Sequence, residues 1–206
     1  MRLLLIRHGQ TPANVRGELD TAAPGPGLTE FGRAQAAAVP DALASERIDG
    51  IYASRLIRTQ QTAAPLARVR GEMHRVVLPG IHEIAAGGLE GRTDRDAVRA
   101  YVDVIWAWVD GDLAARMPGG DDGHEFFGRF DADIARVSAA HARDDTVAVF
   151  SHGAAIRVWT AARAGNVPRT FPGRHHLENT GVVALEGSPD DGWRVIHWEG
   201  AVELEA

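Results

Sequence analysis

The chain has 206 residues, of which 45% are hydrophobic, and its 22 basic and 28 acidic side chains give a formal net charge of −6. This is the composition of a globular protein with enough apolar material for a core, which excludes the disordered and fibrous classes. The acidic balance and the lack of a basic tract argue against a general nucleic-acid or membrane-surface binder, so we expect neither among its partners.

Short apolar runs alternate with helical patterns over the first 80 residues. Residues 3–6 form a continuous apolar run, as expected of a strand buried on both faces. Residues 28–44 have the pattern of a helix that is capped by Thr29 and kinked or split at Pro40. A second strand at 51–53 is followed by Ser54, which is placed to cap the next helix, and a third strand is expected at 76–78.

The composition changes between residues 87 and 123, where paired glycines and acidic residues enclose an aromatic-rich helix at about 95–109. We interpret residues 84–130, approximately, as a small helical insertion within a single domain of residues 1–206. A helix at 126–142, a strand at 147–150 and a further helix follow. The last two expected strands are at 181–185 and 193–198. The alternation of strands and helices along the chain predicts an α/β sheet with crossover helices.

Three of the expected strands lead directly into cationic or imidazole side chains. These are Arg7-His8-Gly9, Arg58 in the segment after the second strand, and Ser151-His152-Gly153. Ligands of open α/β sheets bind at the carboxyl ends of the strands, so these side chains are expected to meet in one crevice. Arginine matches phosphate oxygens in a bidentate way, and a helix N-terminus at Gly153 adds N–H donors, so the crevice suits a phosphoryl group.

Missing residue types remove several mechanisms. The chain has no cysteine, and all 22 of its basic residues are arginine. Thiol nucleophiles, disulfides and cysteine-bound metals are therefore excluded, as are Schiff-base catalysis and the lysine of P-loop enzymes. The apolar run at residues 3–6 is too short for a signal peptide or a membrane span, so we expect a cytoplasmic protein.

Further motifs accompany the strand-end residues, in one order and over nearly the whole chain. They are Arg7-His8-Gly9-Gln10-Thr11, Asn14, Gly17, Leu28-Thr29, Gly32, Gln35-Ala36, Ser54, Leu56, Arg58-Thr59, Gln61-Thr62, Glu83-Ile84, Gly87, Leu89-Glu90-Gly91, Ser151-His152-Gly153, Ile156-Arg157 and Asn179-Thr180. With these motifs the chain resembles the histidine phosphatase superfamily, the phosphoglycerate-mutase-like group. Pattern and resemblance together predict a three-layer α/β/α fold, with a mostly parallel central sheet flanked by helices and the insertion over the active site.

The resemblance implies a role for each matching site residue. His8 would be the nucleophile that is phosphorylated on a ring nitrogen, and Glu83 would be the general acid and base. The phosphoryl group would be bound by Arg7, Asn14, Arg58, His152 and Gly153. This chemistry needs no metal and no other cofactor, so we expect none.

These roles predict a metal-independent phosphatase that hydrolyses a small phosphorylated metabolite through a phosphohistidine intermediate. One alternative is a 2,3-bisphosphoglycerate-dependent phosphoglycerate mutase, which shares the same residues; members that resemble the mutases are generally longer, which favours hydrolysis here. The other alternative is a catalytically weak module that binds a phospholigand or a protein. Exposed aromatic residues are compatible with a homodimer, but nothing in the sequence requires one, and nothing in it names the substrate.

Other motifs have a functional and a structural interpretation. Asp131-Ala132-Asp133 resembles the motif of aspartate-nucleophile phosphatases, but it lies within an expected helix, so a packing role is favoured. His175-His176 with Glu178 would suit a metal only in a closed ligand set, so a polar loop near the pocket is favoured. His82 either orients Glu83, touches substrate or is a plain loop residue.

The insertion and the tail raise two more questions. Trp106 and Trp108 are two residues apart and cannot share a helix face, so one is expected in the core and the other at the pocket or a partner. Arg92, Arg116 and Arg174 are candidates for binding a second anionic group of the substrate, with scattered surface arginines as the slightly favoured alternative.

Overall fold

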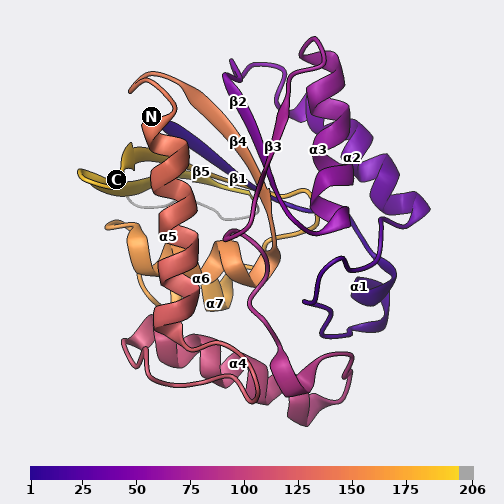
Figure 1. The fold of residues 1–206 in the computed structure, drawn as a ribbon, viewed down its shortest axis with the longest axis vertical. Coiled ribbons are helices and arrows are strands. Elements are labelled where there is room, and N and C mark those ends of the chain that lie inside the picture. Colours follow the sequence, from indigo (N-terminus) through magenta and orange to yellow (C-terminus); the bar gives the residue numbers. More distant parts are fainter. Residues whose placement is uncertain (200–206) are drawn as a thin grey trace.

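The computed structural model describes residues 1–199, which contain a six-stranded sheet in the order β3-β2-β4-β1-β5-β6 (Figure 1). Its strands are β1 (Arg2–Arg7), β2 (Gly50–Ser54), β3 (Arg75–Leu78), β4 (Thr146–Ser151), β5 (Val182–Ser188) and β6 (Gly192–Trp198). The pairs β1–β4, β2–β4 and β2–β3 are parallel, whereas β5 pairs antiparallel with both β1 and β6. All six predicted strands and the mostly parallel sheet are confirmed.

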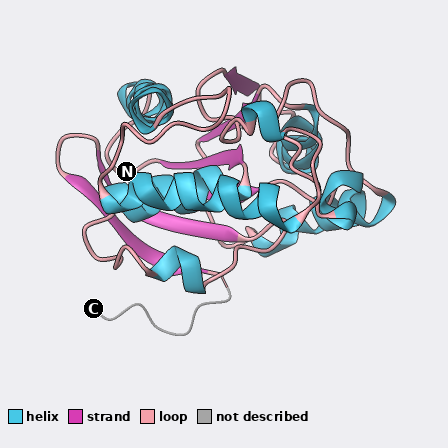
Figure 2. Ribbon diagram, turned by 90° about the horizontal axis from the view of Figure 1, so that it is seen from below, coloured by secondary structure: helices cyan, strands magenta, loops and turns pink. Residues whose placement is uncertain are grey.

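Helices flank this sheet, as predicted (Figure 2). They are α1 (Pro12–Arg16), α2 (Glu30–Ala42), α3 (Ile57–Val69), the 3₁₀ turn η1 (Gly87–Leu89), α4 (Arg95–Asp110), α5 (Gly123–Ala139), α6 (Gly153–Arg163) and α7 (Phe171–Arg174). The helices expected after residues 28, 54, 95, 126 and 153 are all present. The hydrophobic pattern does not predict the short helices α1 and α7.

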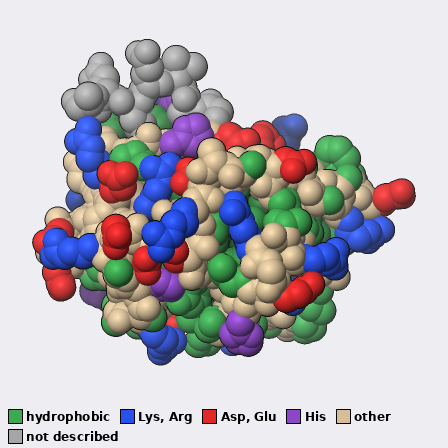
Figure 3. Space-filling model, turned by 90° about the horizontal axis from the view of Figure 1, so that it is seen from above, with side chains coloured by type: hydrophobic (Ala, Val, Ile, Leu, Met, Phe, Trp, Pro, Cys, Tyr) green, Lys and Arg blue, Asp and Glu red, His purple; other side chains and the backbone are tan. Residues whose placement is uncertain are grey.

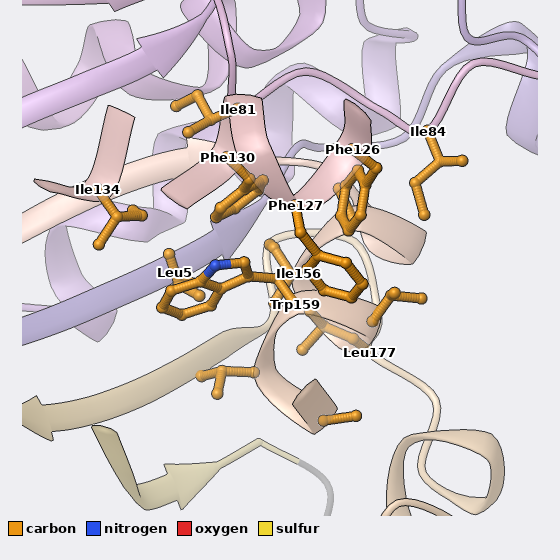
Figure 4. Close-up of a cluster of buried hydrophobic side chains, with 14 of the residues drawn as sticks. Leu5, Ile81, Ile84, Phe126, Phe127, Phe130, Ile134, Ile156, Trp159 and Leu177 are labelled. Atoms are coloured by element: carbon orange, nitrogen blue, oxygen red, sulfur yellow. The ribbon is translucent and has the colours of Figure 1, made fainter. Parts of the chain in front are cut away.

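Two hydrophobic clusters explain why the first strand is apolar at all four of its inner positions, residues 3–6. Leu3 and Leu5 belong to a cluster with α4, α5 and α6, in which aromatic rings from α5 and α6 pack against one another (Figure 4). Leu4 and Ile6 belong to a second cluster with α2 and α3. Successive strand residues point to opposite faces, so β1 is covered on both sides and its carboxyl end is left open between the layers.

Two details differ from the sequence prediction in the first half of the chain. α2 is capped by Thr29 as predicted, but Pro40 does not split it: the proline forfeits one i→i−4 bond, and the helix ends two residues later, at Ala42. Ser54 does not cap α3, which begins after Leu56 with no side-chain cap. The Ser54 hydroxyl lies two residues too early for that role and bonds to His152 instead.

The predicted start of the helix at residue 126 is also wrong. α5 begins at Gly123, three residues earlier, after a capping box in which Asp122 and Glu125 each bond to the other's backbone N–H. The apolar periodicity begins only at Phe126, so it marks the buried face and not the helix end, which the cap decides.

The surface agrees with the mixed composition. On the face shown in Figure 3, basic and acidic side chains lie intermixed. Among the helices of residues 1–199, none combines the length and the apolar character that crossing a membrane would require.

Candidate active site

A cavity of about 160 Å³ lies where β1 and β4 end. Six of the seven predicted site residues line it: Arg7, His8, Asn14, Arg58, Glu83 and Gly153. The seventh, His152, is fully buried beside His8, with the two ring centroids 5.2 Å apart. The structure therefore brings together side chains from the end of β1, from α1, α3 and α6, and from the loop after β3.

The ring of His8 is held in one orientation by both of its nitrogens. Nδ1 lies 2.7 Å from the carbonyl oxygen of Gly9, to which it donates, and Nε2 accepts from Nε of Arg58 at 3.1 Å. Burial, together with the charges of Arg58 and Arg7, lowers the pKa of His8 well below its ordinary value. The ring is therefore neutral near pH 7, with its lone pair on Nε2.

Two guanidinium groups lie near this ring, that of Arg58, which is buried, and that of Arg7, which is partly buried. Arg58 is 2% exposed and also donates from Nη2 to the carbonyl oxygen of Asp20 at 2.9 Å. Arg7 donates from Nη1 to the carbonyl oxygen of Leu177 at 2.6 Å, and this nitrogen lies 3.4 Å from His176 Nε2. Burial lowers the pKa of both arginines, which nevertheless stay charged at neutral pH.

His152 directly precedes α6, and its ring is oriented by Ser54, the residue that was wrongly predicted to cap α3. Its Nε2 lies 2.7 Å from the hydroxyl of Ser54, while its Nδ1 is buried without a hydrogen-bond partner in the described part of the chain. Buried polar atoms are nearly always paired in proteins, so this nitrogen is a candidate to meet a ligand. Burial and the charge of Arg58 lower the pKa of His152 well below its ordinary value.

The carboxylate of Glu83 is fixed by backbone donors at the start of α6. Oε1 accepts from the N–H groups of Ile84 at 2.9 Å and Ala155 at 2.8 Å, and Oε2 accepts from that of Ala154 at 3.2 Å. The positive end of a helix favours a negative side chain at such a position. The carboxylate thus lies in the cavity wall with a defined orientation.

Asn14 lies at the cavity with its amide oxygen already used. Oδ1 accepts from the backbone N–H of Thr11 at 3.0 Å and from Nδ2 of Asn179 at 3.2 Å. Its own Nδ2, a donor, is the atom left for a ligand.

The stability of the protein is expected to fall in acid because His8 and His152 are buried in neutral form. Their pKa values lie well below the ordinary 6.5, so below that pH the unfolded chain takes up protons that the folded protein does not. Each histidine then lowers the free energy of unfolding by up to about 1.4 kcal/mol per pH unit until its folded pKa is reached. Urea unfolding near pH 7 and pH 5 should show a smaller acid loss in His8→Gln than in wild type; equal losses would contradict this assignment.

The aspartates of the Asp131-Ala132-Asp133 motif have structural partners. Asp131 accepts from Trp159 at 2.7 Å and pairs with Arg163, while Asp133 bonds to the backbone of Gly80. Neither lines the cavity, which agrees with the packing role favoured from the sequence.

The histidine candidates separate in space. His175 stacks on Phe171, with ring centroids 4.0 Å apart, whereas His176 lines the cavity. Within residues 1–199, no three His, Asp or Glu side chains are grouped as a metal site requires. His82 lies 2.6 Å from the carbonyl oxygen of Pro79 and is not part of the cavity wall; burial and Arg129 lower its pKa to about 4.

Arg157 belongs to one of the sequence motifs, Ile156-Arg157, but no role in the site was predicted for it. The three arginines predicted as candidates for a second anion, Arg92, Arg116 and Arg174, are not among the described residues that line the cavity, whereas Arg157 is. Its guanidinium lies over the ring of Trp106, 5.7 Å from the centroid, while Trp108 is buried in the core. Arg157 follows Gly153 by four residues, so the shared helix face was a usable signal.

Comparisons with known proteins agree with this geometry. A family model described as the histidine phosphatase superfamily (branch 1) matches residues 3–200. The chain is 39% identical over 209 residues to the PE-PGRS family protein PE_PGRS11 of Mycobacterium tuberculosis, covering 95% of this chain but only 36% of that protein. It is 33% identical over 139 residues to the adenosylcobalamin/alpha-ribazole phosphatase of Salmonella typhimurium, with 68% of each chain covered. A solved structure of mycobacterial glucosyl-3-phosphoglycerate phosphatase superposes with a TM-score of 0.80 at 26% identity, over 97% of this chain and 99% of that one.

Proposed function

This chain belongs to the histidine phosphatase superfamily, and we propose that it hydrolyses a small phosphomonoester through a phosphohistidine formed on Nε2 of His8. The single observation that carries the proposal is the state of His8, a neutral ring whose Nδ1 donates to Gly9 while Nε2 faces Arg58. Such a ring has its lone pair on the nitrogen that must attack phosphorus, and it needs no base to activate it.

In the first step, Nε2 of His8 attacks phosphorus and the bond to the substrate's ester oxygen breaks. The phosphoryl group would take the place next to Nε2 that the Arg58 N–H now holds, so the same guanidinium would face a phosphoryl oxygen. Arg7, Arg58 and the unpaired nitrogen of His152 would stabilise the charge on the equatorial oxygens. Glu83 would deliver a proton to the departing ester oxygen.

In the second step, Glu83 would accept a proton from a water molecule that attacks phosphorus and releases His8. Phosphate leaves, and the proton has returned to the carboxylate for the next cycle. Glu83 suits both roles because its carboxylate lies in the cavity wall and is oriented from behind by backbone N–H groups.

The buried part of the substrate is small. A cavity of about 160 Å³ is below the range of about 300–1,000 Å³ that is usual for sites enclosing a whole drug-sized ligand. It suits a phosphoryl group and a few neighbouring atoms, with the rest of a larger substrate outside. Two relatives are named as phosphatases with different substrates, which supports hydrolysis as the shared reaction and does not choose a substrate.

The test is to incubate the purified protein, with a chelator present, against a panel of phosphorylated metabolites that includes 3-phosphoglycerate. Free phosphate and isomerised phosphoglycerate are both followed. We expect phosphate release from at least one compound, lost in His8→Ala. Isomerisation that depends on 2,3-bisphosphoglycerate would instead make the protein a mutase. If no compound of the panel gives phosphate or an isomer, a binding module is favoured.

A further inference from the structure

The guanidinium of Arg58 is oriented by a loop that has no regular structure of its own. Besides the bond from Nη2 to the Asp20 carbonyl oxygen, Nη1 lies 3.5 Å from Oδ2 of Asp20. The loop approaches so closely that a Cβ on Gly25 would lie 2.5 Å from this Nη1. Residues 18–29 contain no helix or strand. The orientation of Nη1 and Nη2 of Arg58 therefore depends on the position of this loop.

One carboxylate, from a segment about 70 residues away, holds residues 21 and 22 of this loop, beside the backbone hydrogen bonds that join Leu19 to Gly91 and Arg92. Glu90 accepts from the backbone N–H groups of Thr21 at 2.7 Å and Ala22 at 2.9 Å, and from the Thr21 hydroxyl at 2.5 Å. The Thr21 hydroxyl in turn accepts from the N–H of Ala86 at 2.8 Å. Each of these donors and acceptors is thereby satisfied, so the connection has one preferred geometry.

The chain of contacts then continues to the reacting atom. Asp20 precedes Thr21 directly and contacts two nitrogens of Arg58, whose third nitrogen, Nε, lies 3.1 Å from His8 Nε2. A shift of the Thr21 backbone would move the carbonyl oxygen of Asp20 and with it the guanidinium. Misplacing a group that binds the transition state by about 1 Å can cost on the order of 100-fold in rate.

We infer that Glu90 and Thr21 are positioning residues, which set the orientation of Arg58 through Asp20; the inference rests on the proposed phosphatase function. Thr21 lines the cavity, but its hydroxyl is already bonded to Glu90 and Ala86, so neither residue needs to touch the phosphoryl group for this role. Their effect on turnover should therefore exist only while Arg58 is present.

A double-mutant cycle tests this dependence. Thr21→Val removes the hydroxyl at constant shape, and Glu90→Gln replaces one acceptor oxygen with a donor; each is made in wild type and in Arg58→Ala, with Arg58→Lys as a second background. With p-nitrophenyl phosphate as substrate, we expect each single change to lower kcat/KM by about 10- to 100-fold. In the Arg58→Ala background, the same changes should cost no more than about twofold.

Two further variants separate positioning from general stability. Thr21→Ser keeps the hydroxyl and should recover most of the kcat/KM that Thr21→Val loses. Asp122→Asn weakens the cap of α5, remote from Arg58, and should lower the thermal midpoint without a comparable loss of kcat/KM.

Multiplicative losses in the two backgrounds would overturn the inference, because Glu90 and Thr21 would then act independently of Arg58. If the wild-type protein hydrolyses no phosphomonoester, the proposed function fails separately. In that case, calorimetry measures the affinity of the same single and double variants for orthovanadate, which occupies a phosphoryl site without turnover. Coupling to Arg58 in that affinity would support the positioning role, and its absence would refute it.

Discussion

Replacing His8 with alanine is expected to lower kcat/KM for every substrate by at least about 10⁴-fold, because it removes the atom that forms the bond to phosphorus. The remaining arginines would still bind phosphate, so the variant should bind orthovanadate while failing to turn over. The measurement is phosphate release, together with rapid quenching of enzyme mixed with ³²P-labelled substrate. The wild type should yield a protein-bound label that is stable in alkali and lost in acid, as a phosphohistidine is.

A matched control is available in His74, which is exposed. His74→Ala should keep both the activity and the label. The proposed mechanism fails if His8→Ala retains more than a few per cent of wild-type kcat/KM, or if it acquires the same label at another residue.

Replacing Glu83 with glutamine is expected to lower kcat/KM by about 10²- to 10⁴-fold for alkyl phosphates, whose ester oxygen leaves as a poor leaving group without a proton. The loss for p-nitrophenyl phosphate should be at least tenfold smaller, because nitrophenolate is a good leaving group and departs without being protonated. Glutamine keeps one oxygen that can accept from Ile84 and Ala155, as Oε1 does now, and loses only the acceptor for the N–H of Ala154, so the wall of the cavity should largely keep its shape. The comparison is a series of esters of graded alcohol acidity.

The second step gives an independent readout for the same variant. Glutamine cannot take the proton from water, so phosphohistidine should accumulate after the first turnover. A burst of nitrophenolate equal to the enzyme concentration, followed by slow release, is the expected trace. Equal losses across the ester series, with no burst, would remove Glu83 from the general acid and base role.

Much of the fold could be predicted from local pattern. The strands are visible because β1 and β4 are apolar on both faces, and α2 begins where its cap, Thr29, is found in the sequence. Prediction failed where a helix end is decided by something other than periodicity, as at Asp122 before α5. The extent of the insertion and the roles of the site residues stay predictions.

In the candidate site, too, some residues could be predicted from the sequence and others could not. Arg7 ends β1, and His8 and His152 directly follow β1 and β4, so the rule that ligands bind at strand carboxyl ends was enough to bring them together. Arg157 shares a helix face with Gly153 and was within reach of the same reasoning. Asp20, by contrast, lies on an irregular loop, and no pattern in the sequence assigns it a contact with Arg58.

The sequence by itself determined the six strands, the five longer helices and the chemical groups at the strand ends, because these depend on residues that are neighbours in the chain. Tertiary structure alone decided how those groups are oriented. Ser54 meets His152 across 98 positions of sequence, and Glu90 holds Thr21 across 69. Such bonds depend on the three-dimensional path of the chain between the partners, which leaves no local periodicity to read.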